Sequence, residues 1–330
     1  KGEDPTLVDA ALAADERRRA LQGEGDALRA ERNIASKSIG EAIKGGAQPD
    51  GPEVAVLRAR STVIGERLTA IDAELAEVEA TVEDLLLRIP NPAEADIPIG
   101  GEEANVTVRT WGEQLQHDQP LEGEIGADAP AGGASWERRP HWDVAEQLGM
   151  IDLARGAKIA GSGFPVYRGA GSALQRSLIM WFLDVHTREN GFTEIWPPIV
   201  VNQASARGTG QIPDKEDQMY VVTRDDLYLV PTAEVPVTNL HRDEILDASD
   251  LPIRYAAYTP CFRREAGAAG KDTRGILRVH QFDKVEMVLF ERPEASAEAL
   301  EWMTGVAEDL LRRLGLAYRV LLMATREMGF

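Results

Sequence analysis

Two neighbouring segments of the chain place a cation, an aromatic ring and carboxylates at alternating positions. The first carries Arg263 and Glu265, and the second carries Phe282, Lys284 and Glu286. Alternate side chains of a β-strand share a face, so each set points to one side of its strand. Arginine holds phosphate and an aromatic ring stacks a planar base, so this face fits a phosphorylated ligand with a flat base. The alternative is a solvated strand face with incidental salt bridges.

A second cluster of residues that could bind a ligand is Thr232, Ala233 and Glu234. Thr232 occupies the expected N-cap of a helix, and Glu234 falls in the first turn, where the helix dipole favours a carboxylate. One interpretation is an ordinary capping arrangement. The other is that Glu234 binds an ammonium group, and the residues alone leave both open.

Other candidate sites are excluded on spacing. Residues 267–273 resemble a phosphate-binding loop but lack its glycine spacing, and they lie between two expected strands, which indicates a hairpin loop. The five histidines show no metal-ligand spacing, so no metal ligands are predicted. The single cysteine, Cys261, excludes an intrachain disulfide.

We find no secretory signal and no apolar run long enough for a bilayer, which indicates a cytoplasmic protein without a membrane partner.

Strands and helices alternate in the second half of the chain, and hairpin-connected strands favour an antiparallel sheet in an α+β fold. His280 is expected to share its strand face with Phe282. Expected strands are 192–201, 226–230, 253–265, 275–290 and 317–323, and expected helices are 172–186, 233–245 and 293–314.

The N-terminal part has a different pattern. Apolar residues recur every seven positions from Leu57 to Leu85, and smaller residues do so from Leu7 to Ala42, as in a coiled coil. Breaker residues 45–52 separate the two runs, which predicts an antiparallel helical hairpin roughly 55 Å long. We expect a coiled-coil arm over 1–92, a linker over 93–135 and a second domain over 136–330.

The charge balance limits how such a protein can contact nucleic acid. The 330 residues include 36 basic and 55 acidic side chains, which give a net charge of −19. A field of this sign repels phosphate at long range, so nucleic-acid contacts must come from local basic patches. Basic residues of the expected arm are candidates, and a solvated coiled-coil face is the alternative for each.

Together these segments resemble the class II aminoacyl-tRNA synthetases, and in particular the seryl-tRNA synthetases of bacterial type. Residues 260–286 resemble motif 2, and residues 172–200 resemble motif 1 with Pro198 as its proline. The helical arm resembles the tRNA-binding arm of this family. Further points of similarity are the Thr-x-Glu serine loop at Thr232-Ala233-Glu234, Gly208-Thr209-Gly210-Gln211, and His141-Trp142 with Leu148-Gly149.

The resemblance implies a fold, a reaction and a set of site residues. The fold is an antiparallel sheet flanked by helices, and the reaction joins serine to tRNA(Ser), with tRNA(Sec) as a further acceptor, through seryl-adenylate made with ATP and Mg2+. Arg263 is implied as the catalytic residue on the α-phosphate, and a homodimer is implied through the region around Pro198. Implied ligand contacts are Arg263, Arg264, Glu265, Val279 and Phe282 for ATP; Thr232, Ala233, Glu234 and Glu286 for serine; Arg29, Arg32 and Lys37 for tRNA.

The resemblance is incomplete at the ends of the chain. The third class II motif is expected after Phe330, and the start of the first arm helix before Lys1, so we expect a chain truncated at both ends. Residues 325–330 also depart from the family's usual Thr-Gly-Asp-Met-Gly-Phe. The alternative is therefore that the chain is a catalytically incomplete, synthetase-like protein with a tRNA-binding or regulatory function.

Overall fold

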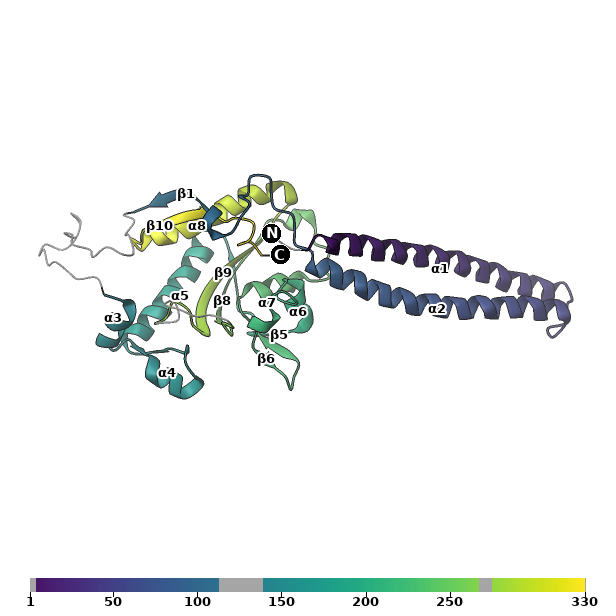
Figure 1. The fold of residues 1–330 in the computed structure, drawn as a ribbon, viewed down its shortest axis with the longest axis horizontal. Helices are drawn as coiled ribbons and strands as arrows, with labels where there is room; N and C mark the ends of the chain where they lie inside the picture. The colour runs from purple at the N-terminus through teal and green to yellow at the C-terminus, as the bar shows by residue number, and fades with distance from the viewer. Residues whose placement is uncertain (1–3, 113–138, 267–274, 330) are drawn as a thin grey trace, which may run out of the picture. The chain divides into compact units, whose positions relative to one another are not determined.

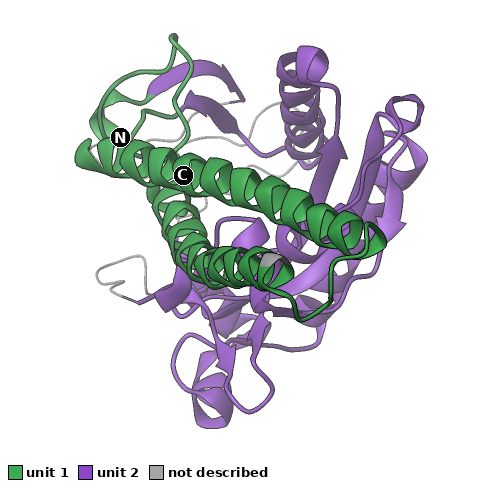
Figure 2. Ribbon diagram, turned by 90° about the vertical axis from the view of Figure 1, so that its right-hand side faces the viewer, with its two compact units in different colours: residues 1–105, 323–330 green, residues 106–322 purple. Residues whose placement is uncertain are grey.

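The computed structural model describes residues 4–112, 139–266 and 275–329 (Figure 1). The chain divides into two compact units (Figure 2). Unit 1 comprises residues 1–105 and 323–330, and unit 2 comprises residues 106–322. No helix of the described residues combines the length and the apolar character needed to cross a membrane.

Unit 1 is built on a helical hairpin of α1 (Thr6–Lys44) and α2 (Pro52–Arg88), which confirms the predicted antiparallel arm. Pro52 stands at the start of α2, where its missing N–H costs no helical hydrogen bond. The seam is buried as the heptads predict. It contains Ala11, Leu21, Gly25 and Ala35 from α1, and Val54, Ile64, Leu68 and Ile71 from α2.

A ladder of ion pairs runs along one side of this seam. Arg17 pairs with Glu74, Glu24 with Arg67, and Glu31 with Arg60. Each step advances seven residues on α1 and retreats seven on α2, as an antiparallel pair of helices requires. The side chains are partly exposed, so each pair adds little to stability. We call these three pairs the ion-pair ladder.

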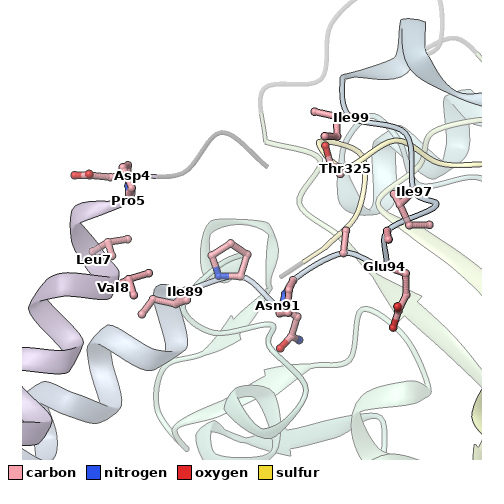
Figure 3. Close-up of a pocket in the computed structure, with 14 residues that line it drawn as sticks. Asp4, Pro5, Leu7, Val8, Ile89, Asn91, Glu94, Ile97, Ile99 and Thr325 are labelled. Carbon is pink, nitrogen blue, oxygen red and sulfur yellow. The ribbon is translucent and has the colours of Figure 1, made fainter.

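The rest of unit 1 is irregular and held by backbone hydrogen bonds. It includes the 3-10 helix η1 (Glu102–Ala104). The N–H of Thr325 donates to the carbonyl of Pro98 at 2.9 Å, and that of Arg326 to Gly100 at 3.0 Å. Beside this contact lies a cavity of about 500 Å³, shown in Figure 3. Its lining is mainly aliphatic and includes Leu7, Val8, Ile89, Ile97 and Ile99.

Unit 2 is organised around a three-stranded sheet with the order β4-β8-β9. Its strands are β4 (Thr193–Ile195), β8 (Ile253–Phe262) and β9 (Gln281–Phe290). β8 and β9 are antiparallel along their full length, whereas β4 runs parallel to β8. α5 (Ala170–Arg188) packs on one face, where Gln175 and Tyr258 both donate hydrogen bonds to Asp283. Helix α7 (Glu234–Thr238) contacts β9, with Val237 in a small core beside Ala257 of β8.

A smaller antiparallel sheet has the order β5-β7-β6. It consists of β5 (Val200–Asn202), β6 (Val221–Val222) and β7 (Leu227–Leu229), and α6 (Gln203–Gly208) packs beside it. Its core contains Val201, Ala206, Ile212, Met219, Tyr228, Val230 and Val235. Val235 belongs to α7, so this helix contributes to the cores of both sheets.

The remaining elements of unit 2 are a two-stranded pair, one long helix and several short segments. β1 and β10 are antiparallel, and α8 is tied to β1 because Arg109 forms an ion pair with the buried Glu308 at 2.5 Å. These elements are β1 (Val106–Trp111), α3 (His141–Gln147), β2 (Ile151–Asp152), α4 (Leu153–Ala160), β3 (Val166–Tyr167), α8 (Ser296–Arg313) and β10 (Tyr318–Leu322), with the 3-10 turns η2 (Glu216–Gln218), η3 (Asn239–His241), η4 (Ala248–Asp250) and η6 (Pro293–Ala295).

The α+β fold class is confirmed, but several predicted elements are wrong in extent. The single strand expected over 192–201 is two strands, β4 and β5, in different sheets. Pro197 and Pro198 lie between them, and proline has no N–H to continue a ladder. The helix expected over 233–245 ends at Thr238 and continues only as the 3-10 turn η3.

The central hairpin is also shorter than predicted. β8 ends at Phe262, not at 265, and β9 begins at Gln281, not at 275. The residues beyond the ladder are therefore free to form loops around a cavity. β1 lies inside the segment 93–135 that we expected to be a linker, while residues 113–138 fall outside the described residues. The predicted domain boundaries remain predictions.

Candidate active site

A cavity of about 820 Å³ lies in unit 2 where the start of α7, the turn after β8 and the segment before β9 meet. Most of the predicted ligand-binding residues line it. They are Thr232, Glu234, Arg263, Glu265, Val279 and Phe282. The sequence pattern therefore identified the residues of one cavity, although they come from separate segments.

Arg263 and Phe282 form a stacked pair in the wall of this cavity. The guanidinium carbon of Arg263 lies 5.1 Å from the centre of the Phe282 ring. Its Nε donates to the carbonyl of Pro231 at 3.4 Å, and its backbone N–H donates to the carbonyl of His280 at 3.0 Å. The cation therefore covers one face of the aromatic ring and is held at the cavity.

Glu265 follows β8 in an unusual backbone conformation. Its φ is 50°, in the left-handed region that non-glycine residues rarely adopt. Gln218 stabilises this turn: its side-chain amide accepts from the N–H of Ala266 at 3.1 Å and donates to the carbonyl of Ala266 at 3.3 Å. The Glu265 carboxylate also lies 3.4 Å from Arg278. Since Glu265 is not in the strand, the shared face with Arg263 that alternation predicted is wrong, although both residues line the cavity.

Thr232 joins the start of α7 to β9. Its buried hydroxyl donates to the carboxylate of Glu286 at 2.6 Å and accepts from the N–H of Glu234 at 3.2 Å. The helix begins at Glu234, so its N-cap residue is Ala233 and the predicted N-cap at Thr232 is wrong by one position. Lys284 forms an ion pair with Glu286 on the same strand face.

Glu234 is open to the cavity, but the surrounding protein removes much of its water. This desolvation raises the pKa of its carboxyl group, and the negative charge of Glu286 raises the pKa further. Lys284 and Lys215 oppose the shift. A carboxylate that is costly to ionise in this cavity is stabilised in its charged form by a bound cation, which an ammonium ligand supplies.

The cavity is basic overall. Its lining includes four cations, Lys215, Arg263, Arg278 and Lys284, against the carboxylates of Glu234 and Glu265. This positive excess occurs in a chain of net charge −19 and gives the local phosphate affinity that the composition alone argues against.

Sequence reasoning missed several of these residues. Lys284 was placed on the strand face of Phe282 and Glu286 but was given no ligand contact. Lys215, Gln218 and Arg278 carried no pattern that would have identified them, because they enter the cavity from loops and from the 3-10 turn η2.

Three of the predicted ligand contacts are absent from the cavity lining: Arg264, Ala233 and Glu286, of which Glu286 bonds to the lining residue Thr232. Arg264 donates through its backbone N–H to the carbonyl of Gln218 at 2.8 Å and through its guanidinium to that of Asp217 at 2.9 Å. The side chain of Ala233 is fully buried in the core under α7. His280 precedes β9 and stacks on Phe164 at 5.2 Å instead of sharing the face of Phe282. The predicted hairpin loop over 267–273 lies outside the described residues.

The predicted tRNA contacts all lie on α1, in unit 1. Arg29 forms ion pairs with Asp26 and Asp72, at 3.1 Å and 2.8 Å. Arg32 is exposed, and the ammonium of Lys37 lies 3.9 Å from Glu41 with the side chain 80% exposed. Arg32 and Lys37 are therefore more accessible to an external polyanion than Arg29.

The described residues contain no group of three or more His, Cys, Asp or Glu side chains that could hold a metal ion. Two of the carboxylates at the cavity are already engaged, since Glu265 faces Arg278 and Glu286 faces Lys284 and Thr232. The described residues thus do not by themselves form a site for Mg2+.

Comparisons with known proteins agree with this arrangement. Residues 220–330 match the tRNA synthetase class II core domain (G, H, P, S and T), which defines the class of the fold and site. Residues 1–93 match the seryl-tRNA synthetase N-terminal domain. The serine–tRNA ligase of Gemmatimonas aurantiaca is 48% identical over 98% of this chain and 71% of its own length. That of Exiguobacterium sibiricum is 48% identical over the whole chain and 73% of its length.

Solved structures give the same answer. The seryl-tRNA synthetase from Pyrococcus horikoshii complexed with ATP has a TM-score of 0.79 and 36% identity, over 96% of this chain and 70% of that one. The cytoplasmic serine–tRNA ligase of Naegleria fowleri in complex with AMP has a TM-score of 0.76 and 26% identity, over 96% and 72%. The chain belongs to the seryl-tRNA synthetase family.

Proposed function

We propose that this chain is a serine–tRNA ligase that activates serine with ATP and transfers it to tRNA. The observation that carries the proposal is the single basic cavity in which Arg263 and Phe282 lie close to Thr232 and Glu234. The first two side chains suit a nucleotide, and the second two suit a small ligand with an ammonium group and a hydroxyl.

In the first step, a serine carboxylate oxygen attacks the α-phosphorus of ATP. The new P–O bond forms as the bond to the β-phosphate oxygen breaks, and pyrophosphate leaves with that electron pair. No protein nucleophile is required, so the site acts by positioning and by stabilising charge on the phosphate. Arg263 is the proposed source of that stabilisation. As its guanidinium moves to the phosphate, the face of Phe282 that it covers becomes available to the base.

The other nucleotide contacts follow from the cavity lining. Glu265 is proposed to accept a hydrogen bond from the adenine amino group, and the backbone around Val279 to line the base. Arg264 contributes through its backbone, because its guanidinium bonds the carbonyl of Asp217. Mg2+ is proposed to enter with ATP.

Serine is proposed to bind beside Thr232. Glu234 faces the ammonium group, and Glu286, oriented by Thr232, completes the pocket for the hydroxyl. Ala233 takes part only through its backbone, since its side chain is in the core. In the second step, a terminal hydroxyl of tRNA attacks the activated carbonyl carbon, and AMP leaves. A pocket that hydrogen-bonds a substrate hydroxyl rejects alanine by about 10⁴-fold or more.

The proposed partners are tRNA(Ser), with tRNA(Sec) as a further acceptor, and a second copy of the chain. The arm over residues 1–92 would contact tRNA through Arg29, Arg32 and Lys37, while residues 93–135 link it to a catalytic domain over 136–330. A homodimer would form around Pro198, which is exposed. The same proposal has the enzyme act in the cytoplasm.

The test is serine-dependent exchange of pyrophosphate into ATP, run in parallel with threonine, alanine and no amino acid. Exchange with serine alone supports the proposal, and Arg263→Ala should abolish it while leaving the fold intact. No exchange by a folded chain that still binds tRNA would favour the alternative, a tRNA-binding or regulatory protein. No present observation favours that alternative.

The arm has its own test. Charge reversal at two exposed positions, Arg32→Glu with Lys37→Glu, should weaken tRNA binding and leave pyrophosphate exchange unchanged. A matched control is the reversal of Glu41, the neighbour of Lys37, to Lys, which should not weaken tRNA binding. Equal tRNA affinity in both variants would show that Arg32 and Lys37 do not contact tRNA.

A further inference from the structure

One wall of the candidate active site lies outside the sheet ladder. Ile276, Leu277, Arg278 and Val279 line the cavity, but the ladder between β8 and β9 ends at the pair Phe262 and Gln281. The wall therefore gains no strand hydrogen bonds, and other contacts must fix its position.

The C-terminal end of this wall is anchored at His280. Its backbone N–H donates to the carbonyl of Gly163 at 2.8 Å, and its carbonyl accepts from the N–H of Arg263 at 3.0 Å. Its ring Nδ1 also lies 3.1 Å from the carbonyl of Arg263. These contacts fix the residues next to β9 but not the start of the wall.

The start of the wall is anchored at His141, the first residue of α3. The N–H of Ile276 donates to Nε2 of His141 at 2.9 Å. Because a backbone N–H can only donate, Nε2 is the accepting nitrogen and carries no proton, which assigns the proton of the neutral ring to Nδ1.

Gly275 provides a second, independent observation that the imidazole of His141 packs directly against the backbone at the start of the wall. Its φ is +81°, and a Cβ atom added there would lie 2.1 Å from Nε2 of His141 and 2.9 Å from Cε3 of Trp142. Any other residue at 275 would collide with both rings and pay the cost of a left-handed backbone. The chain thus approaches His141 as closely as glycine permits.

There is little packing behind this part of the wall. A second cavity of about 550 Å³ is lined by Gly275 and Ile276 together with His141 and Trp142. Ile276 is a partition between the two cavities, since it lines both. A backbone segment with open space on each side depends on its few hydrogen bonds for position.

We propose that His141 is a positioning residue for the nucleotide-binding wall: its imidazole holds Ile276, and through Ile276 the residues up to Val279. This inference rests on the proposed function of the cavity. Serine is proposed to contact Thr232, Glu234 and Glu286, none of which belongs to the wall. Loss of the His141 acceptor should therefore weaken ATP binding and leave serine binding unchanged.

The test is calorimetric titration of the 330-residue chain with ATP and, separately, with serine. His141→Phe keeps a ring beside Trp142 but removes the acceptor, and we expect the Kd for ATP to rise about five- to tenfold. His141→Gln carries an oxygen that can accept from Ile276, and it should stay within about twofold of wild type. Gly275→Ala should resemble His141→Phe, because the added methyl displaces the same contact.

Two results would overturn the inference. One is an unchanged Kd for ATP in His141→Phe. The other is an equal loss of ATP and serine binding, or no recovery in His141→Gln, which would mark His141 as a general structural residue. Failure of the proposed function is distinguishable, because the wild-type chain would then bind neither ligand before any variant is compared.

Discussion

The hydroxyl of Thr232 donates a 2.6 Å hydrogen bond to the carboxylate of Glu286, a residue 54 positions further along the chain. The same oxygen accepts from the backbone N–H of Glu234 at 3.2 Å. One buried side chain therefore sets the spacing between the two carboxylates proposed to hold serine, although one is on α7 and the other on β9.

Removing this hydroxyl should impair serine binding selectively. Thr232→Val keeps the shape of the buried side chain but removes the hydroxyl donor from Glu286, which is left with only the Lys284 ion pair. Losing one hydrogen bond to a charged group costs about 1.5–3 kcal/mol. We expect the Kd for serine to rise roughly 10- to 100-fold, with ATP binding unchanged. Thr232→Ser is the matched control and should bind serine nearly as wild type. A Val variant with normal serine affinity would contradict the linkage.

Serine binding should depend on pH through Glu234. Desolvation and the charge of Glu286 raise the pKa of the Glu234 carboxyl above its ordinary value of 4.5. Below that raised pKa the group is protonated and neutral, so it loses its attraction for an ammonium ion. Serine affinity should therefore be highest above the raised pKa and fall, by up to about tenfold per pH unit, as the pH drops below it. Titrations across this range should show the fall in wild type, while Glu234→Gln should bind weakly and without it.

The turn that carries Glu265 should depend on Gln218. Gln218→Leu removes both hydrogen bonds to Ala266, so the left-handed conformation of Glu265 loses its support. We expect the Kd for ATP to rise about tenfold, because Glu265 no longer faces the base, and serine binding to persist. Asp217→Ala is the matched control, since Asp217 bonds Arg264 only through its carbonyl. Equal ATP affinity in both variants would exclude this role for Gln218.

Stability at acid pH should be limited by His186. Its side chain is 2% exposed, its Nδ1 has no hydrogen-bond partner among the described residues, and burial lowers its pKa below 6.5. As the pH falls through 6.5, His186 binds a proton in the unfolded chain but stays neutral in the folded chain. The free energy of unfolding therefore decreases with falling pH until the lowered pKa of the folded state is reached. The loss reaches about 1.4 kcal/mol per pH unit.

Urea unfolding at several pH values on both sides of 6.5 measures this effect. His186→Leu cannot bind the proton, and its free energy of unfolding should decline less steeply with acid than that of wild type. Parallel curves for the two proteins would show that His186 does not limit stability.

Much of the site was predictable because strand alternation survives in β9. Phe282, Lys284 and Glu286 share a face from sequence periodicity alone, and the structure keeps them beside the cavity or bonded to its lining. The coiled-coil arm was equally predictable, because heptad spacing reflects the geometry of two packed helices.

The rest depended on backbone geometry that periodicity does not encode. Glu265 lines the cavity from a turn with a positive φ, and Gln218 reaches the same turn from the 3-10 turn η2. Arg264 has a side chain suited to phosphate, yet it bonds carbonyl groups of a neighbouring loop. Residue type therefore indicated the chemistry that the cavity offers, while loop conformation decided which residues face it.

The ion-pair ladder of the arm also specifies alignment. On α1 the charges follow the order Arg17, Glu24, Glu31, and their partners on α2 are, in the same order, Glu74, Arg67 and Arg60. Apolar heptads alone would tolerate a slip of seven residues, because the seam repeats with that period. A slip in one direction would bring Arg17 opposite Arg67, and a slip in the other would bring Glu24 opposite Glu74. The asymmetric charge order thus disfavours hairpins with a shifted register, because like charges would then face each other. Each pair nevertheless adds little to the stability of the correct hairpin.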